Sequence, residues 1–171
     1  MKIAFYFVDA EYIEYLKNIE MKSRGFTTVP NVHYANRDKF VYGVVLAIHE
    51  LNYFVPVSSY IKKKQDNILI RIKEHKKEKI AGSLRFNFMI PIPKECLIPF
   101  DFKTAKIQEA KKVFVEKEYR FCRSNLSAIQ KQALRTYYRV VNKTDEVLLK
   151  NSCDFKLLEK ACESYTGNMA K

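Results

Sequence analysis

The stretch from Pro56 to Lys64 gathers side chains that are suited to chemistry on a phosphodiester. An apolar run ends there in two hydroxyls, an aromatic ring and three ammonium groups, contributed by Ser58, Ser59, Tyr60, Lys62, Lys63 and Lys64. Hydroxyls hydrogen-bond phosphate oxygens, lysines neutralise phosphate charge, and a tyrosine ring stacks on an unpaired base. By composition alone, a polar loop with ordinary surface lysines is the plainer interpretation.

A second stretch, His33–Phe40, mixes aromatic, amide and cationic groups in the same way. Its candidate contact residues are Tyr34, Arg37 and Lys39. Asp38 is expected to pair with a close neighbour, and a simple Asx turn explains the composition without any ligand. Tyr12 follows Asp9 on the first expected helix, where it is either a contact residue or plain core.

Familiar enzyme motifs are missing from the sequence. It has no GxGxxG or GxxxxGK[ST] phosphate loop, no GxSxG elbow and no HExxH. The three histidines are scattered, and the acidic residues form no DxD or ExD cluster for two metal ions. The four cysteines show no CxxC spacing and are expected to be reduced, buried thiols. We therefore expect no metal and no cofactor.

The net charge of +12 comes from two segments. Residues 62–79 carry eight Lys and Arg against three Asp and Glu, and residues 103–142 carry ten against three. Concentrated positive charge favours a nucleic acid as partner, with an anionic membrane surface as a weaker alternative. The apolar stretch Phe40–Ile48 is too short to span a bilayer, and acidic residues interrupt any signal peptide. A cytoplasmic protein that does not enter the membrane is expected.

The 171 residues, of which 47% are hydrophobic, predict one domain over residues 1–171. Strands are expected at 2–8, 40–48, 53–57, 67–73 and 80–92, with Gly43 marking a bend or a close approach of backbones. Asp9 is a natural N-cap for a helix over 11–20. Residues 21–38 show no periodicity and are expected to form a long loop.

The second half of the chain is expected to be helical, over 103–122, 124–141 and 155–165. Ser124 is the predicted cap between the first two of these helices. The outer face of the middle helix presents Lys131, Arg135, Tyr138 and Arg139. Strands followed by helices predict an α+β domain, with a compact, strongly bent antiparallel β-sheet or barrel core and surrounding helices.

Taken together, these landmarks resemble the ToxN/AbiQ family, the endoribonuclease toxins of type III toxin–antitoxin systems, and within it the CptN branch. A strand and a helix of the form AEYIEYLK (10–17) open the chain, and a Tyr-x-Asn entry leads into FVYGVVLAI (40–48). The run FVPVSS (54–59) then leads into lysines, RFNFMIPIP (85–93) precedes the helices, and CDFKLLEKACESY (153–165) resembles the last helix.

The resemblance implies a core like that of Kid and MazF toxins. It also implies metal-independent cleavage of cellular or phage RNA, leaving a 2′,3′-cyclic phosphate and a 5′-hydroxyl. The implied inhibitor is a small repeated antitoxin RNA that folds as a pseudoknot. The toxin would cut its precursor and stay bound, in a closed ring of alternating protein and RNA such as three plus three.

The resemblance also assigns residues. Ser59 resembles the family's strand-end serine, Ser58 its neighbouring threonine, and Lys62 the nearby lysine, with Lys63 as a substitute. Tyr34 and Lys39 resemble the aromatic and the lysine before the long strand, with Arg37 left open. Tyr12 resembles the first-helix tyrosine. Tyr60, Lys63, Lys64 and the outer face of the middle helix are expected to bind RNA.

Combined with the resemblance, the charge distribution predicts that segment 62–79 belongs to the reaction site and that segment 103–142 grips the antitoxin RNA. Two alternatives remain at this point. A non-catalytic RNA-binding protein would use the same grooves. A DNA-binding regulator would use Arg135, Tyr138 and Arg139, although no helix-turn-helix is evident.

Overall fold

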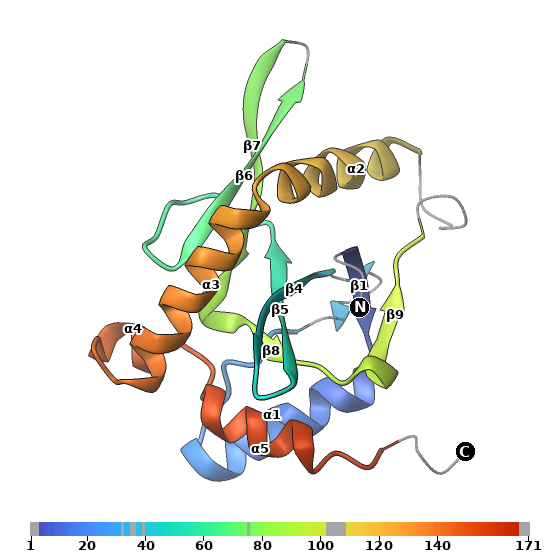
Figure 1. The fold of residues 1–171 in the computed structure, drawn as a ribbon. Coiled ribbons are helices and arrows are strands. Elements are labelled where there is room, and N and C mark those ends of the chain that lie inside the picture. Colours follow the sequence, from blue (N-terminus) through green and yellow to red (C-terminus); the bar gives the residue numbers. More distant parts are fainter. Residues whose placement is uncertain are drawn as a thin grey trace.

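The computed structural model describes residues 4–31, 33–34, 37–38, 40–74, 76–101 and 109–167. Seven strands form one antiparallel sheet in the order β6-β7-β5-β4-β1-β9, with β8 paired to β5 off this path. Their bounds are β1 Ala4–Val8, β4 Val41–Ile48, β5 Leu51–Ser58, β6 Asn67–Glu74, β7 Lys77–Arg85, β8 Ile90–Pro91 and β9 Leu97–Pro99. The predicted antiparallel core is confirmed (Figure 1), but the described strands form an open sheet and not a closed barrel.

The strands expected at 40–48 and 53–57 are confirmed as β4 and β5, which form a hairpin joined by a tight turn. Gly43 lies opposite Phe54, and the register shifts immediately after it. A Cβ at Gly43 would lie 2.1 Å from Cδ1 of Phe54, so the expected close approach is made by an aromatic ring. The strand bends at this point because the glycine lets the ring pack against the backbone.

Five helices are seen in the described parts of the chain: α1 Ala10–Arg24, α2 Glu109–Ser124, α3 Leu126–Val141, α4 Glu146–Lys150 and α5 Phe155–Glu163. The predicted N-cap of α1 is confirmed, since an Asp9 carboxylate oxygen accepts the backbone N–H of Glu11 at 2.7 Å. The prediction for Ser124 is wrong: it is the last residue of α2, and Asn125 occupies the N-cap of α3 without a side-chain cap bond. Helix α4 was not predicted, because five residues are too few to show periodicity.

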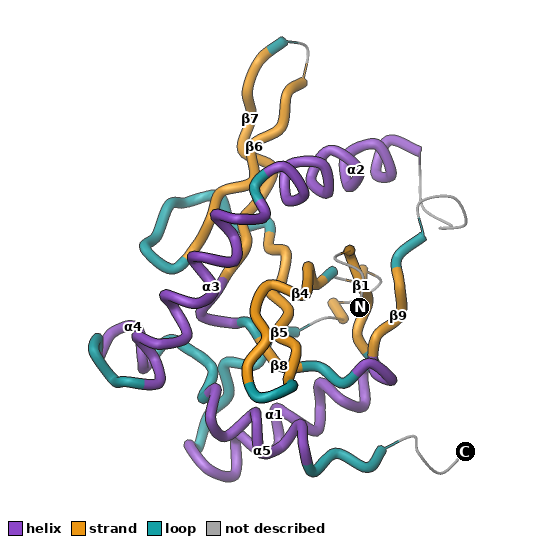
Figure 2. The backbone as a smooth tube through the Cα atoms, viewed as in Figure 1, coloured by secondary structure: helices purple, strands orange, loops and turns teal. Residues whose placement is uncertain are grey.

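The helices pack on the sheet from different sides. Helices α1 and α5 contact each other, α3 packs on β4, and α2 packs on β6. In the view of Figure 2, α1 and α5 lie below the strands, α3 lies to the left of β4 and β5, and α2 lies above β1 and β4, with the β6–β7 hairpin rising beyond it. The hydroxyls of Tyr53 on β5 and Tyr137 on α3 both donate to Glu159 on α5, at 2.9 and 2.6 Å. Buried tyrosines therefore tie the helical layer to the centre of the sheet.

The core is rich in aromatic rings, and Tyr12 belongs to it. This tyrosine has no exposed surface, and its hydroxyl donates to the carbonyl oxygen of Pro91 at 2.7 Å. Its ring meets Tyr165 edge-on with centroids 4.9 Å apart. The RNA-binding role predicted for Tyr12 is therefore wrong, because a buried ring cannot stack on a base. The four cysteines are buried and free, as expected.

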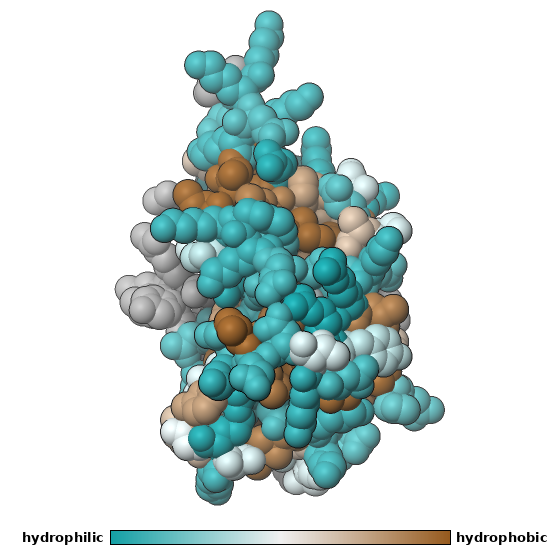
Figure 3. All heavy atoms as spheres, turned by 90° about the vertical axis from the view of Figure 1, so that its left-hand side faces the viewer, coloured by the Kyte–Doolittle hydropathy of each residue, from teal (hydrophilic) through white to brown (hydrophobic). Residues whose placement is uncertain are grey.

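The β6–β7 hairpin extends well beyond the rest of the fold (Figure 1). Seen from the side of α3 and α4, its protruding tip carries hydrophilic side chains, and most of this face is hydrophilic as well (Figure 3). Arg71 and Lys73 of β6 line a shallow hollow together with Lys117 and Arg120 of α2. The basic segment 62–79 is therefore split into two parts in the fold. Arg71 and Lys73, on the hairpin, lie with the basic residues of α2 and apart from the lysines that follow β5. Within the described residues, no helix is long and apolar enough to cross a membrane.

Candidate active site at the end of strand β5

A groove of about 370 Å³ opens where β5 ends, and we call it the Ser58 groove. Its lining comes from segment 27–31, Phe40, segment 56–58, Arg85 at the end of β7, and Phe88. The β5–β7 pairing, which places Ser58 opposite Ser83, brings these parts together. The groove thus joins four stretches that are far apart in the sequence.

Two serine hydroxyls hold the turn that follows β5. The Ser58 hydroxyl accepts the backbone N–H of Tyr60 at 3.2 Å, and the Ser83 hydroxyl donates to the Tyr60 carbonyl at 2.6 Å. Ser58 is half-buried on the groove wall, whereas Ser59 is exposed at the crest of the turn. The predicted serines therefore lie on a turn whose backbone is fixed on both sides.

Gly82 on β7 supports this turn from behind. A Cβ at Gly82 would lie 2.4 Å from the carbonyl oxygen of Ser58, a distance that no side chain tolerates. The same Cβ would lie 3.6 Å from a carboxylate oxygen of Glu118 on α2. Glu118 is buried, and this burial raises the pKa of its carboxyl to about 7. A titratable carboxyl is thus packed beneath the strand end that carries the serines.

The three lysines after Tyr60 are arranged around the buried side chain of Asn67. Its amide nitrogen donates to the carbonyl of Lys62 at 2.9 Å, and its amide oxygen accepts the backbone N–H of Lys64 at 2.9 Å. The ammonium group of Lys63 donates to the backbone carbonyl of Asn67. The Lys62 side chain is exposed, and no hydrogen bond joins it to another described side chain. Of the two alternatives, Lys62 is therefore the one with a free ammonium group.

Arg85 is a site residue that the sequence did not single out. Its guanidinium carbon lies 4.7 Å from the ring centroid of Tyr60 and 4.7 Å from that of Phe88. The Nε of Arg85 is buried without a hydrogen-bond partner, and no ion pair joins the residue to another described side chain. An arginine held between two rings and lacking a carboxylate is prepared to bind an anion.

The chain enters and leaves the second predicted stretch, His33–Phe40, at the same groove. Asn31, just before the stretch, and Phe40, at its end, both line the groove, and the Phe40 carbonyl accepts the backbone N–H of Val57 at 3.0 Å. Between them, β2 (His33–Tyr34) pairs with β3 (Arg37–Asp38), so that Tyr34 stands opposite Arg37 along the backbone. Lys39 lies outside the described residues. The roles of Tyr34 and Arg37 in the site stay a prediction.

The outer face of α3 contacts the loop that carries Lys62, Lys63 and Lys64. Arg139 forms an ion pair with Asp145 and donates to the side chain of Gln65 at 3.2 Å. Gln132 on the same helix donates to the Gln65 carbonyl at 3.0 Å. The remaining predicted contact residues of this helix are exposed, namely Lys131, Arg135 and Tyr138. This helix face thus adjoins the loop of Lys62, Lys63 and Lys64 through Gln65.

The described lining of the Ser58 groove contains no Asp, Glu, His or Cys. No group of three such residues is close enough to hold a metal ion anywhere in the described parts of the chain. The groove instead supplies hydroxyls, a stacked guanidinium and nearby ammonium groups. Such a set binds a phosphodiester, orients it and stabilises added negative charge.

The family model described as toxin ToxN of type III toxin–antitoxin systems matches residues 4–163 of the chain. The endoribonuclease AbiQ of Lactococcus lactis subsp. lactis is 31% identical, over 97% of this chain and 91% of its own length. The endoribonuclease ToxN of Bacillus thuringiensis subsp. kurstaki is 28% identical, over 94% of this chain and 83% of its own length.

Solved structures agree with these relatives. The structure of AbiQ, a lactococcal anti-phage endoribonuclease of a type III system, superimposes with a TM-score of 0.76. It is 29% identical over 95% of this chain and 97% of that one. A type III toxin–antitoxin structure, concerned with toxin inhibition by a non-coding RNA pseudoknot, superimposes with a TM-score of 0.82. It covers 98% of this chain and 99% of that one at 24% identity, and so it bears on the fold alone.

Proposed function

Because the chain belongs to the ToxN family, the endoribonuclease toxins of type III toxin–antitoxin systems, we propose that it cleaves RNA in the Ser58 groove without a metal ion. The observation that carries this proposal is the arrangement of Ser58 and Arg85 on one groove wall, beside Ser59 and Lys62. Every cationic group in this arrangement is suited to a phosphate, and the described lining offers no competing carboxylate.

The proposed reaction is a transesterification within the RNA. The ribose 2′-oxygen attacks the adjacent phosphorus, a new O2′–P bond forms, and the P–O5′ bond breaks. The 2′-hydroxyl loses its proton and the departing 5′-oxygen gains one, which leaves a 2′,3′-cyclic phosphate and a 5′-hydroxyl. Arg85 and Lys62 stabilise the charge of the pentavalent phosphorane, while Ser58 and Ser59 orient the phosphate and the attacking hydroxyl. Catalysis therefore rests on positioning and electrostatics.

We further propose that Tyr34, and Lys39 or Arg37, complete the groove from the side of segment 31–40. The residues that flank this stretch, Asn31 and Phe40, both line the groove, which supports this role. The exposed Tyr60 turn, Lys64 and the outer face of α3 provide the surface over which RNA approaches, because the helix adjoins this loop through Gln65. Lys63 contributes to the same turn through its bond to Asn67.

The proposed inhibitor is a small repeated antitoxin RNA that folds as a pseudoknot, is cut by the toxin and remains bound. An assembly of alternating protein and RNA, such as three plus three, would let each RNA bridge two copies. We place this activity in the cytoplasm, where cellular and phage transcripts are the substrates. The concentration of basic residues around the groove supports an RNA partner.

Cleavage of an adenine-rich RNA by the purified protein in EDTA tests the proposal. We expect cyclic phosphate ends that are independent of Mg²⁺, and a loss of at least about 100-fold in rate for Ser59→Ala. Ser124→Ala, at the exposed end of α2, is the matched control and should cleave normally. Cleavage that requires Mg²⁺ would overturn the mechanism, and binding without any cleavage would identify an RNA-binding protein instead.

A further inference from the structure

A second hollow, of about 520 Å³, lies where the end of α3 meets the ends of α1 and α4 and the start of α5. We call it the helix-end pocket. It is larger than the Ser58 groove, and its size is that of pockets that bind small molecules or single nucleotides. The two hollows share no lining residue, although segment 24–31 contributes to both. Nothing in the proposed cleavage mechanism uses this pocket.

The pocket is basic, and two of its four cations are free to bind a ligand. Arg24 is paired with the buried Glu20 at 2.8 Å, and Lys156 with Glu159 at 2.8 Å. Lys143 and Lys150 are exposed, and neither forms an ion pair with another described residue. The lining's one carboxylate, Asp154, accepts the backbone N–H of Leu157 at 3.1 Å as the cap of α5. The pocket therefore has an unmatched positive charge.

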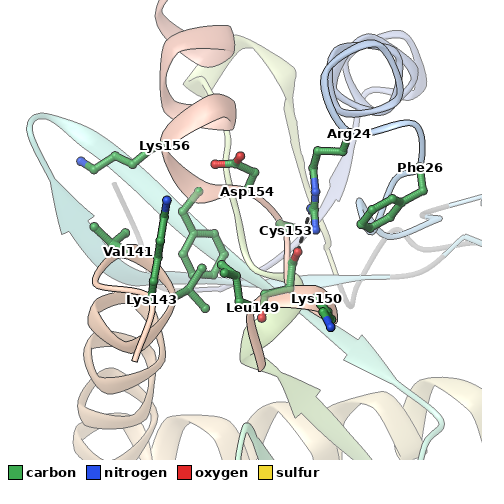
Figure 4. Close-up of a pocket in the computed structure, with 12 residues that line it drawn as sticks. Arg24, Phe26, Val141, Lys143, Leu149, Lys150, Cys153, Asp154 and Lys156 are labelled. Carbon is green, nitrogen blue, oxygen red and sulfur yellow. Dashed lines mark hydrogen bonds between the residues drawn. The ribbon is translucent and has the colours of Figure 1, made fainter. Parts of the chain in front are cut away.

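The pocket lining also includes an exposed aromatic ring. Phe26 is 43% exposed, an unusual state for phenylalanine, and the Arg24 guanidinium lies 4.3 Å from its ring centroid. Arg24 is in turn fixed by a bond to the Ser152 carbonyl at 2.9 Å. Figure 4 shows Phe26 and Lys150 at one end of the hollow and Lys143 and Lys156 at the other. The pocket therefore offers an aromatic face at one end and ammonium groups at both ends, which together match a base and its flanking phosphates.

We propose that the helix-end pocket binds one unpaired nucleotide of an RNA strand, with the base on Phe26 and the phosphates at Lys150 and Lys143. This inference extends the proposed function, because it gives the RNA a second anchor away from the reaction site. An exposed aromatic face in a pocket with unpaired lysines favours a nucleotide over a folded protein segment. The strand has two sources, substrate RNA or the single-stranded parts of the antitoxin RNA, and both present the same chemistry to the pocket.

Binding of RNA that cannot be cleaved tests the pocket independently of catalysis. The probes are a 2′-O-methylated unstructured oligoadenylate of about twelve nucleotides and a 2′-O-methylated pseudoknot with single-stranded tails, followed by fluorescence anisotropy. For Lys143→Ala with Lys150→Ala, we expect Kd to rise about tenfold and the salt dependence to weaken by about two counterions. Phe26→Leu keeps an apolar side chain but should raise Kd at least about fivefold through lost stacking.

The matched control is Lys22→Ala with Lys160→Ala, which removes the same charge from exposed positions of α1 and α5 outside this lining. If the pocket variants bind the oligoadenylate more weakly, the pocket belongs to substrate RNA. If they bind only the pseudoknot more weakly, it belongs to the inhibitor RNA. Either result supports the proposal. If the pocket variants weaken neither probe more than the control pair does, the pocket is not an RNA site. Cleavage of a short RNA by the wild type is scored separately, so failure of the proposed function would be recognised on its own.

Discussion

The Ser58 groove and the helix-end pocket both combine aromatic rings with cations, yet they are built differently. In the groove, the polar groups Ser58 and Arg85 stand at the ends of two neighbouring strands, where Ser58 faces Ser83 and the Arg85 guanidinium lies against two rings. The pocket is made by helix ends, from which Lys143 and Lys150 extend on long, exposed side chains. Sites on packed strands hold groups more precisely than sites on flexible side chains do. The difference suggests that the groove is built for a reaction and the pocket for attachment.

Among these substitutions, replacing Arg85 in the Ser58 groove should have the largest effect on the rate of cleavage. Arg85→Met keeps the length of the side chain but removes the charge beside the phosphate, and we expect kcat/KM to fall about 100-fold. Arg85→Lys should restore little of this, because an ammonium group cannot stack between two rings. Single-turnover cleavage of a short RNA measures the effect.

Arg120→Met is the matched control, because this arginine is exposed on α2 and paired only with Glu116 among the described residues. It should cleave at nearly the wild-type rate. If Arg85→Met retained more than about half of the activity, the guanidinium would not belong to the reaction site.

A paired glycine experiment tests whether the precision of the turn matters. Gly82→Ala places a methyl group against the Ser58 carbonyl, and Gly43→Ala places one against the Phe54 ring. Both should destabilise the fold by about 1–3 kcal/mol, since both overpack it. Only Gly82→Ala should also lower kcat, by about tenfold, because it displaces the serine turn. Equal loss of kcat in both variants would show that general destabilisation, and not placement of Ser58, is responsible.

The smallest expected effect concerns pH. Glu118, beneath the groove, has its pKa raised by burial to about 7, so its contribution to stability is complete below its ordinary value of 4.5 and is lost as pH rises through 7. Burial would also raise the pKa of Glu159, beside the pocket, but hydrogen bonds from Lys156, Tyr137 and Tyr53 outweigh it and lower that pKa. Glu159 therefore stabilises the fold at neutral pH and loses its contribution as pH falls into the acid range.

Urea unfolding at pH 5 and pH 8 separates these carboxyls. Glu118→Gln should gain stability relative to wild type as pH rises, by up to about 3 kcal/mol, because the neutral amide has no charge to desolvate. Glu116→Gln, a more exposed neighbour on α2, is the control and should show almost no such change. A Glu118→Gln profile parallel to that of wild type would mean that Glu118 does not titrate in this range.

Local signals in the sequence were sufficient for most elements. Two apolar runs separated by a short polar turn identified β4 and β5, and the Asp9 cap located the start of α1. The boundary between α2 and α3 was misplaced because a serine favours a cap only where the backbone leaves the helix, and the chain stays helical through Ser124. The residue at which α2 ends depends on how both helices pack, and a local sequence pattern does not contain that information.

The site was only partly predictable for a related reason. Ser58, Ser59 and the lysines are consecutive, so their chemistry is visible in the sequence. Arg85 becomes part of the site only through the β5–β7 register, which places residues 58 and 83 opposite each other. For Tyr12 the error was the opposite one, because a core residue was assigned to RNA binding. Its neighbours Ile13 and Leu16 are buried with it and mark a core face of the helix. The exposed serine and the buried tyrosine look equally polar until the fold is known.

Strand β6 lies at an edge of the sheet, so one side of its backbone has no partner strand. Its exposed residues include Arg71 and Lys73, and Lys76, Lys77 and Lys79 follow at the tip of the hairpin. Lysines on an edge strand disfavour strand-to-strand joining of two copies and the aggregation that follows from it. In the assembly proposed above, the RNA that lies between copies would offset the repulsion between these basic surfaces.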